Sequence, residues 1–75
     1  MDPDELHARV AARIRQRAEA KRLPIKTLAS QAGVSPSHMF AVLNGTRSPT
    51  LSWLCRVADV LGCDPGELVK KPRGA

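Results

Sequence analysis

Few side chains in this sequence have the types and spacings that catalysis requires. His7 and His38 have no Asp, Glu or Cys partner at a spacing typical of a catalytic pair. His7 falls on the apolar stripe of its predicted helix, which favours a half-buried structural imidazole. Ser35 is better explained as a helix cap than as a nucleophile. The sequence therefore predicts no enzyme, no catalytic residue and no cofactor.

The two cysteines are the other reactive side chains. Cys55 and Cys63 are too few for a disulfide framework, and they have no Cys or His neighbours at zinc-ligand spacing. We interpret both as small buried apolar residues rather than as a disulfide or a redox switch. The sequence thus predicts no metal site.

The balance of charge favours binding over catalysis. The 75 residues contain 12 Lys and Arg against 7 Asp and Glu, which gives a net charge of +5 and an isoelectric point of about 10.0. A chain this basic is suited to a polyanionic partner. Its acidic start lacks a signal-peptide pattern, and no apolar run approaches the roughly 18 residues of a membrane span. We therefore expect a soluble, cytoplasmic protein without a membrane partner.

A short helix over residues 36–44 is the element around which the chain is organised. Ser35 is a good N-cap, Pro36 suits the first helical position, and Gly45 can adopt the left-handed conformation that ends a helix. At about 100° per residue, one side of this helix gathers the apolar residues Met39, Val42 and Leu43. The other side carries Ser37, Phe40, Ala41 and Asn44, with His38 at its edge. This outer face indicates a binding surface.

Four more helices are predicted to hold that element in place. They cover residues 3 to about 22, 24 or 25 to about 32, about 50 to 61, and 65 to 70 or 71. The apolar residues are mostly aliphatic, since Phe40 and Trp53 are the only aromatic ones, and this favours packed helices. A chain of this length makes one small domain, which we place at residues 1–71, followed by a flexible basic tail at 72–75.

Two surface features remain open to more than one interpretation. A row along one edge of the first helix is formed by Arg9, Arg13 and Arg17. It is interpreted either as a solvated face or as a docking surface for phosphates or an acidic protein. In the fourth helix, the predicted core face consists of Leu51, Leu54, Ala58 and Leu61, flanked by Cys55 and Val57. Trp53 and Val60 lie off that face, with Arg56 beside them. This pair is ordinary surface, an edge of the core, or a subunit contact.

The order of these parts resembles the DNA-binding domains of the lambda-repressor, Cro and XRE type. The residues that carry the resemblance are Ile14 and Arg15, Leu28 and Ala29, residues 32–35, Met39, Val42, Asn44 and Gly45, residues 48–51, Leu54, Val57 and Ala58, Leu61 and Gly62, and Leu68. The resemblance covers nearly the whole chain. It implies an all-α fold of five short helices, in which the second and third form a helix-turn-helix.

The resemblance also implies roles for individual residues. The third helix, residues 36–44, would enter the major groove of double-stranded DNA. The base-reading candidates are then Pro36, Ser37, His38, Phe40 and Ala41. The phosphate-contact candidates are Lys26, Ser35, Asn44, Thr46 and Arg47. The dimer-interface candidates are Trp53, Arg56, Val60, Pro65 and Val69.

The third helix departs from the family pattern at the positions that commonly read bases. Pro36 stands where the family often has Gln, Ala41 stands where Arg or Gln commonly reads guanine, and Ile25 replaces a frequent Gln at the start of the second helix. The helix has no Arg, Lys, Gln or Asn before Asn44. Base recognition would then rest on contacts to thymine methyl groups, on DNA shape and on the spacing of two half-sites.

These observations predict a sequence-specific DNA-binding transcriptional regulator, a repressor that binds a palindromic operator as a homodimer. Such a protein would be encoded by a bacterium or a phage, and the chain leaves no room for a small-molecule ligand domain. The alternative is a protein-protein interaction module on the same fold, such as an antitoxin or a regulatory adaptor. The apolar character of the third helix motivates this second hypothesis.

Overall fold

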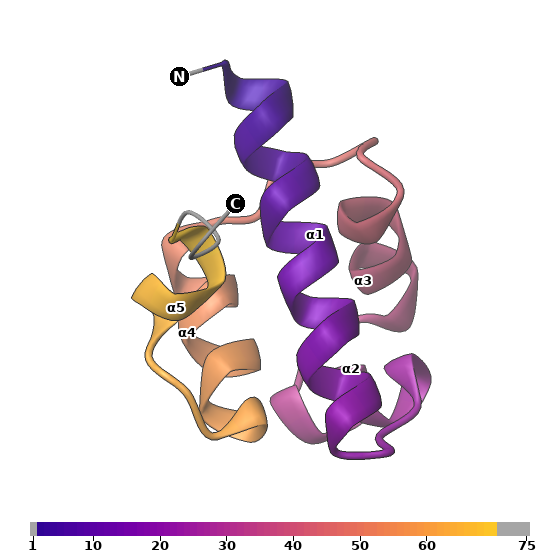
Figure 1. Cartoon of the computed structure of the whole chain (residues 1–75). Helices are drawn as coiled ribbons and strands as arrows, with labels where there is room; N and C mark the ends of the chain where they lie inside the picture. Colours follow the sequence, from indigo (N-terminus) through magenta and orange to yellow (C-terminus); the bar gives the residue numbers. More distant parts are fainter. Residues whose placement is uncertain (1, 71–75) are drawn as a thin grey trace.

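The structure, a computed structural model, describes residues 2–70 and is built entirely of helices over that range (Figure 1). The helices are α1 (Pro3–Ala20), α2 (Ile25–Ala32), α3 (Pro36–Leu43), α4 (Leu51–Leu61) and α5 (Pro65–Val69). The long helix α1 runs through the middle, with α3 on one side, α4 and α5 on the other, and α2 across its carboxyl end. The predicted all-α fold of five helices is therefore confirmed.

Side-chain caps begin four of the five helices. The caps of α1, α3, α4 and α5 are Asp2, Ser35, Thr50 and Asp64, each of which accepts a hydrogen bond from a backbone N–H in the first turn. Such a bond satisfies one of the N–H groups that a helix start leaves unpaired. Helix α2 differs, since it starts after Pro24 with no side-chain cap.

Four helices end in the same backbone motif, which sets the direction of the chain that follows. The residues in the left-handed conformation are Arg22, Gly33, Gly45 and Gly62. In α2, for example, the Gly33 N–H donates to the Ser30 carbonyl at 3.2 Å and the Val34 N–H to the Ala29 carbonyl at 3.0 Å. These paired bonds define a Schellman motif. Among the described residues, Arg22 is the one non-glycine residue with positive φ, at 54°.

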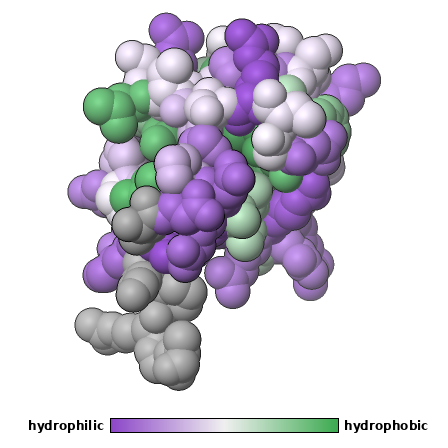
Figure 2. Space-filling view, turned by 90° about the horizontal axis from the view of Figure 1, so that it is seen from above, coloured by the Kyte–Doolittle hydropathy of each residue, from purple (hydrophilic) through white to green (hydrophobic). Residues whose placement is uncertain are grey.

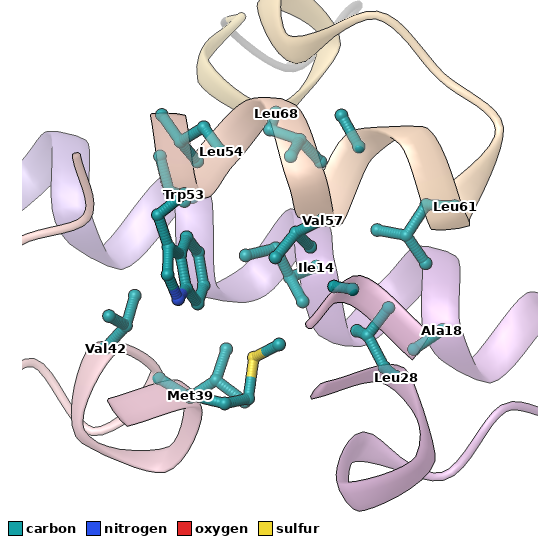
Figure 3. Close-up of a cluster of buried hydrophobic side chains, with 14 of the residues drawn as sticks. Ile14, Ala18, Leu28, Met39, Val42, Trp53, Leu54, Val57, Leu61 and Leu68 are labelled. Atoms are coloured by element: carbon teal, nitrogen blue, oxygen red, sulfur yellow. The ribbon is translucent and has the colours of Figure 1, made fainter. Parts of the chain in front are cut away.

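The core lies where α1 meets the other four helices. All five contribute to it, with fully buried side chains that include Ile14 of α1, Leu28 of α2, Met39 of α3, Val57 of α4 and Leu68 of α5. Figure 3 shows Trp53 reaching from α4 toward Met39 and Val42 of α3, with Ile14 nearby. The underside of α3 is thus held by residues from distant parts of the chain. The outer surface is mostly hydrophilic on the face seen in Figure 2, where hydrophobic side chains form small separate patches.

The arginine row on α1 attaches α5 to the domain. The Arg9 guanidinium donates to the Val69 carbonyl at 3.3 Å, and the Arg13 guanidinium donates to the Lys70 carbonyl at 3.3 Å. Arg17 lies 3.5 Å from the Glu67 carboxylate. Because cations favour the negative end of a helix dipole, these contacts stabilise the docked α5. Neither open interpretation of the row, as a solvated face or as a docking surface for a partner, describes this role.

The buried face of α4 is rotated from the predicted one. Trp53, predicted to lie off the core face, is only 4% exposed and belongs to the core, whereas Leu51, expected in the core, is 82% exposed. The buried side of α4 consists of Trp53, Leu54, Val57, Ala58 and Leu61. At about 100° per residue, Leu51 in the first turn points away from the centre of that side. The large indole ring fills the space between α4 and α3, and this burial decides the rotation.

Smaller differences concern the cysteines and the helix ends. Cys55 is exposed and Cys63 half-buried, so the expectation that both are buried is wrong for Cys55. Helix α1 ends at Ala20, two residues before the prediction, because Arg22 adopts the left-handed conformation. Helix α3 ends at Leu43, one residue before its predicted end at Asn44. Helix α5 ends at Val69, one residue before Lys70, the shorter of its two predicted ends. The predicted tail at 72–75 and the predicted domain end at 71 lie outside the described residues.

Residues 2–70 contain neither a membrane-spanning helix nor a group of metal-binding side chains. No helix in that range is both long enough and apolar enough to cross a bilayer. Likewise, no three His, Cys, Asp or Glu side chains of that range are grouped as a metal site requires.

Candidate nucleic-acid interface

Helix α3 is positioned by a tight turn at its start and by a buried underside. Gly33 takes φ 71° and ψ 28°, a conformation that costs side-chain-bearing residues energy, and Val34 packs partly against the core. The Ser35 hydroxyl then accepts the His38 N–H at 3.4 Å, and Pro36 occupies the first helical position. On the underside, Met39, Val42 and Leu43 are buried, as predicted.

The outer face of α3 is uncovered along its length. Pro36, Ser37, Phe40 and Asn44 are exposed, Ala41 is half-buried, and Phe40 presents a ring that is 42% accessible. No other described element packs over this face. The face therefore combines one hydroxyl, one amide and an apolar centre, which is a surface for methyl and shape contacts more than for paired hydrogen bonds.

His38 is the base-reading candidate that the structure turns away from this outer face. Its ring lies 5.7 Å from the Trp53 ring, measured between centroids, and the two rings are tilted by 38°. The His38 Nε2 atom is buried and has no hydrogen-bond partner in the described part of the chain. In this conformation, Nε2 packs inside the domain and is closed to a base edge. Sequence spacing could not reveal this, since the contact depends on the rotation of α4.

Lys26 and the start of α2 form the first candidate phosphate contact. Lys26 is exposed in the first turn of α2, and that turn has no side-chain cap. Its free N–H groups and the lysine together favour an anion, since a helix start carries partial positive charge. The missing cap is a signal that sequence analysis could have used, because Pro24 offers no side-chain acceptor.

The other phosphate candidates differ in what their polar groups are free to do. The Ser35 hydroxyl accepts the His38 N–H and keeps its own proton available for donation. The Thr46 hydroxyl, in contrast, donates to the Ala41 carbonyl at 3.1 Å, so its proton is already used. Asn44 and Arg47 are exposed, and the Arg47 guanidinium forms no ion pair within residues 2–70. Ser35, Asn44 and Arg47 therefore fit phosphate contacts better than Thr46.

The dimer-interface candidates are spread over α4 and α5 with unequal exposure. Arg56 is exposed, and Val60, Pro65 and Val69 are half-buried. Trp53, at 4% exposure, offers almost no surface to a partner. The exposed Leu51 was not among the candidates, because the predicted rotation of α4 placed it in the core.

Comparison with known families decides the assignment. A family model described as a helix-turn-helix domain matches residues 9–70. The chain belongs to this family. The match runs from the middle of α1 to the end of α5, and α2 and α3 supply the two helices of the motif. No curated protein matches the sequence.

Two solved structures superimpose closely on this member of the family. The hypothetical transcription factor NHTF from Neisseria is 26% identical with a TM-score of 0.87, covering 97% of this chain and 84% of that protein. The restriction-modification controller protein C.AhdI from Aeromonas hydrophila is 31% identical with a TM-score of 0.78. The match covers 83% of this chain and 94% of C.AhdI. The resemblance to repressor-type domains that the sequence indicated is confirmed.

The same fold also occurs as part of longer proteins. An HTH_3 family transcriptional regulator from Vibrio cholerae, 19% identical with a TM-score of 0.82, shares the fold over 89% of this chain and 38% of its own. The iron-containing protein HppE, in complex with its substrate, is 32% identical with a TM-score of 0.74 over 85% of this chain, but only 37% of HppE is covered. The helix-turn-helix domain is therefore a unit that larger chains incorporate.

Proposed function

We propose that this protein is a sequence-specific DNA-binding transcriptional regulator, a repressor that places α3 in the major groove. The observation that carries the proposal is the outer face of α3, a helix fixed from beneath by buried residues and left uncovered on the side of Ser37, Phe40 and Ala41. An α-helix of this size fits the major groove of B-form DNA.

Charge around α3 supports a nucleic acid as the partner. Lys26 and the uncapped start of α2 lie before the turn, and Arg47 follows the helix. No acidic residue belongs to α3 or to the turn before it, so nothing there repels a phosphate backbone. The net charge of +5 adds a general attraction to DNA. Lys26, Ser35, Asn44 and Arg47 would then position the helix without reading sequence.

Sequence would be read by a small set of contacts. Phe40 and Ala41 can meet thymine methyl groups, and Ser37 can donate to or accept from a base edge. Such contacts specify few bases in one domain, so a second copy is needed for a selective site. A homodimer would bind two half-sites about 34 Å apart on one side of the duplex, and its operator would be a palindrome. Arg56, Val60, Pro65 and Val69 are the remaining candidates for that contact.

The relatives fit this proposal in their recorded roles. One is a hypothetical transcription factor and another controls a restriction-modification system. Both match most of this chain and most of their own length, so a protein of this size is sufficient for such roles. We therefore propose that the protein is encoded by a bacterium or a phage and acts in the cytoplasm, with DNA as its main partner.

Binding measurements at several salt concentrations test the proposal. Fluorescently labelled duplexes selected from a random pool should bind, and log K should fall against log salt with a slope of about −0.9 per phosphate contacted. Arg47→Ala should weaken binding to all sequences and reduce that slope by about 1, while the melting temperature stays unchanged. Lys70→Ala, on the α5 side of the domain, is the matched control. It should leave the DNA affinity and the salt slope unchanged.

Three results would contradict the proposal or one of its parts. Absence of DNA binding at low salt would exclude it and favour the protein-interaction module, in which the exposed Phe40 ring would anchor a partner. An Arg47→Ala variant that binds like the parent would remove Arg47 from the contact set. A palindrome among the selected duplexes would support the homodimer, and a single unrepeated half-site would exclude it.

A further inference from the structure

A shallow pocket separates the turn before α3 from the first turns of α4. Its volume is about 310 Å³, and its lining comprises Gly33, Val34, Ser35, His38, Thr50, Ser52, Trp53 and Arg56. The pocket therefore joins the start of α3 to the start of α4, two segments far apart in sequence. None of the proposed base-reading contacts on the outer face of α3 accounts for it.

The polar groups around this pocket are mainly hydrogen-bond donors. Arg56 has no ion pair or hydrogen bond within residues 2–70, and its Nη1 atom folds over the turn, 3.8 Å from where a Cβ on Gly33 would lie. The Ser52 hydroxyl is likewise unpaired in the described range. At the start of α4 the Trp53 N–H donates to the Thr50 hydroxyl at 3.1 Å, which leaves the N–H groups of Leu51 and Ser52 without a partner in that range. No carboxylate lines the pocket. Its electrostatics therefore suit an anion.

Two ring nitrogens at the same place have unmet hydrogen-bonding capacity. Trp53, 4% exposed, carries an Nε1–H that donates to no acceptor among residues 2–70, and His38 Nε2 is also buried without a partner in that range. A buried donor without an acceptor destabilises the folded state, because its hydrogen bond to water is lost and not replaced. Both residues line the pocket, so two ring nitrogens with unmet hydrogen-bonding capacity within residues 2–70 lie beside it.

We propose that this pocket binds a phosphate group, with Arg56 as its charged partner and the start of α4 as its backbone cradle. A guanidinium matches the geometry of a phosphate with two parallel hydrogen bonds, and helix N-termini favour the same charge. Because Ser35 and His38 of the pocket belong to the first turn of α3, an occupant contacts the base-reading helix at its origin. The phosphate is either free in solution or part of a DNA backbone.

Trp53 is the single tryptophan of the chain, so its fluorescence reports on this pocket directly. Inorganic phosphate is titrated into the protein against sodium chloride at equal ionic strength. A saturable change in fluorescence with phosphate, absent with chloride, is the expected result. Arg56→Gln should weaken the apparent affinity at least about tenfold, a loss typical of one charge-assisted contact. Arg15→Gln, which removes an equal charge from exposed α1, should leave the titration unchanged.

A second arm identifies the source of the phosphate. If duplex DNA and inorganic phosphate compete, and Arg56→Gln removes the competition, the pocket holds a backbone phosphate; if they bind independently, it holds a free one. A titration without saturation, or an Arg56→Gln variant that responds like the parent, overturns the proposal. The phosphate titration contains no DNA, so its outcome is independent of whether the protein binds an operator.

Discussion

Two turns in this molecule have the same local structure but lead to helices that pack differently against the rest of the domain. In the turn between α2 and α3, Gly33 takes φ 71°, Val34 tucks inward, and Ser35 caps a helix that starts with proline. In the turn between α4 and α5, Gly62 takes φ 72°, Cys63 follows, and Asp64 caps a helix that also starts with proline. The same backbone bonds close both turns, from the glycine and the residue after it.

The difference lies in what the second helix meets. Helix α3 packs by its underside alone and leaves an open outer face, whereas α5 is five residues long and is held by Arg9, Arg13 and Arg17 of α1. The residues of the turn therefore determine how the chain bends, and neighbouring helices determine whether the new helix can reach a partner. A turn motif alone is weak evidence for a reading helix.

The largest effect is expected at the two glycines. Gly33→Ala and Gly62→Ala should each lower the free energy of unfolding by about 1–2 kcal/mol, because alanine resists the left-handed conformation. The nearest atoms to the added methyl would be flexible side-chain ends, Arg56 Nη1 at 3.8 Å and Lys21 Nζ at 3.6 Å, so clashes add little. Urea denaturation measures both losses.

Asparagine is the matched control at these two positions, because it tolerates the left-handed conformation better than alanine. Gly33→Asn and Gly62→Asn should recover part of the stability that the alanine variants lose. Clearly unequal losses for the two alanine variants would show that the turns are not equivalent in energy.

A smaller effect is expected at the caps. Ser35→Ala and Asp64→Ala should each cost about 1 kcal/mol, with the greater loss at Asp64, whose carboxylate accepts the Gly66 N–H at 2.8 Å. Thermal melting monitored by circular dichroism measures both. The swapped variants Ser35→Asp and Asp64→Ser keep a cap and should lose less than the alanine variants. Ser35→Asp should still weaken DNA binding, because it places a carboxylate beside α3; Asp64→Ser should not.

The smallest effect concerns a thiol and changes a rate only. Cys63 occupies the position in the α4–α5 turn that Val34 occupies in the α2–α3 turn. Burial raises the pKa of the Cys63 thiol, so less of it is thiolate at neutral pH. Iodoacetamide should therefore alkylate the exposed Cys55 faster than Cys63, as peptide mass spectrometry can measure. Equal rates would mean that the α4–α5 turn opens more readily than its packing indicates.

Local signals explain why much of the fold could be predicted from sequence. Ser35 before Pro36, and Asp64 before Pro65, identify helix starts, since capping depends on residues within one turn of each other. Gly33, Gly45 and Gly62 identify helix ends for the same reason. The inner residues of α3 also follow from helical periodicity. These features need no knowledge of the rest of the molecule.

Features that depend on packing between helices could not be predicted. The burial of Trp53 requires the space between α3 and α4 to be known, and the contacts of Arg9, Arg13 and Arg17 require the position of α5. Arg22 ends α1 in a conformation that glycine usually takes, so its residue type gave no warning. In the candidate site, the same limit hid the inward turn of His38.

The attachment of α5 has a practical consequence for engineering. Since Arg13 of α1 holds the carbonyl of Lys70, the chain is fixed at that point, on the side of α1 away from α3 (Figure 1). A fluorescent reporter or an effector domain fused beyond this residue would therefore start from the back of the domain. The fusion would leave α3 clear, and because it would start just after Val69, a candidate for the dimer contact, its effect on self-association would report on that surface.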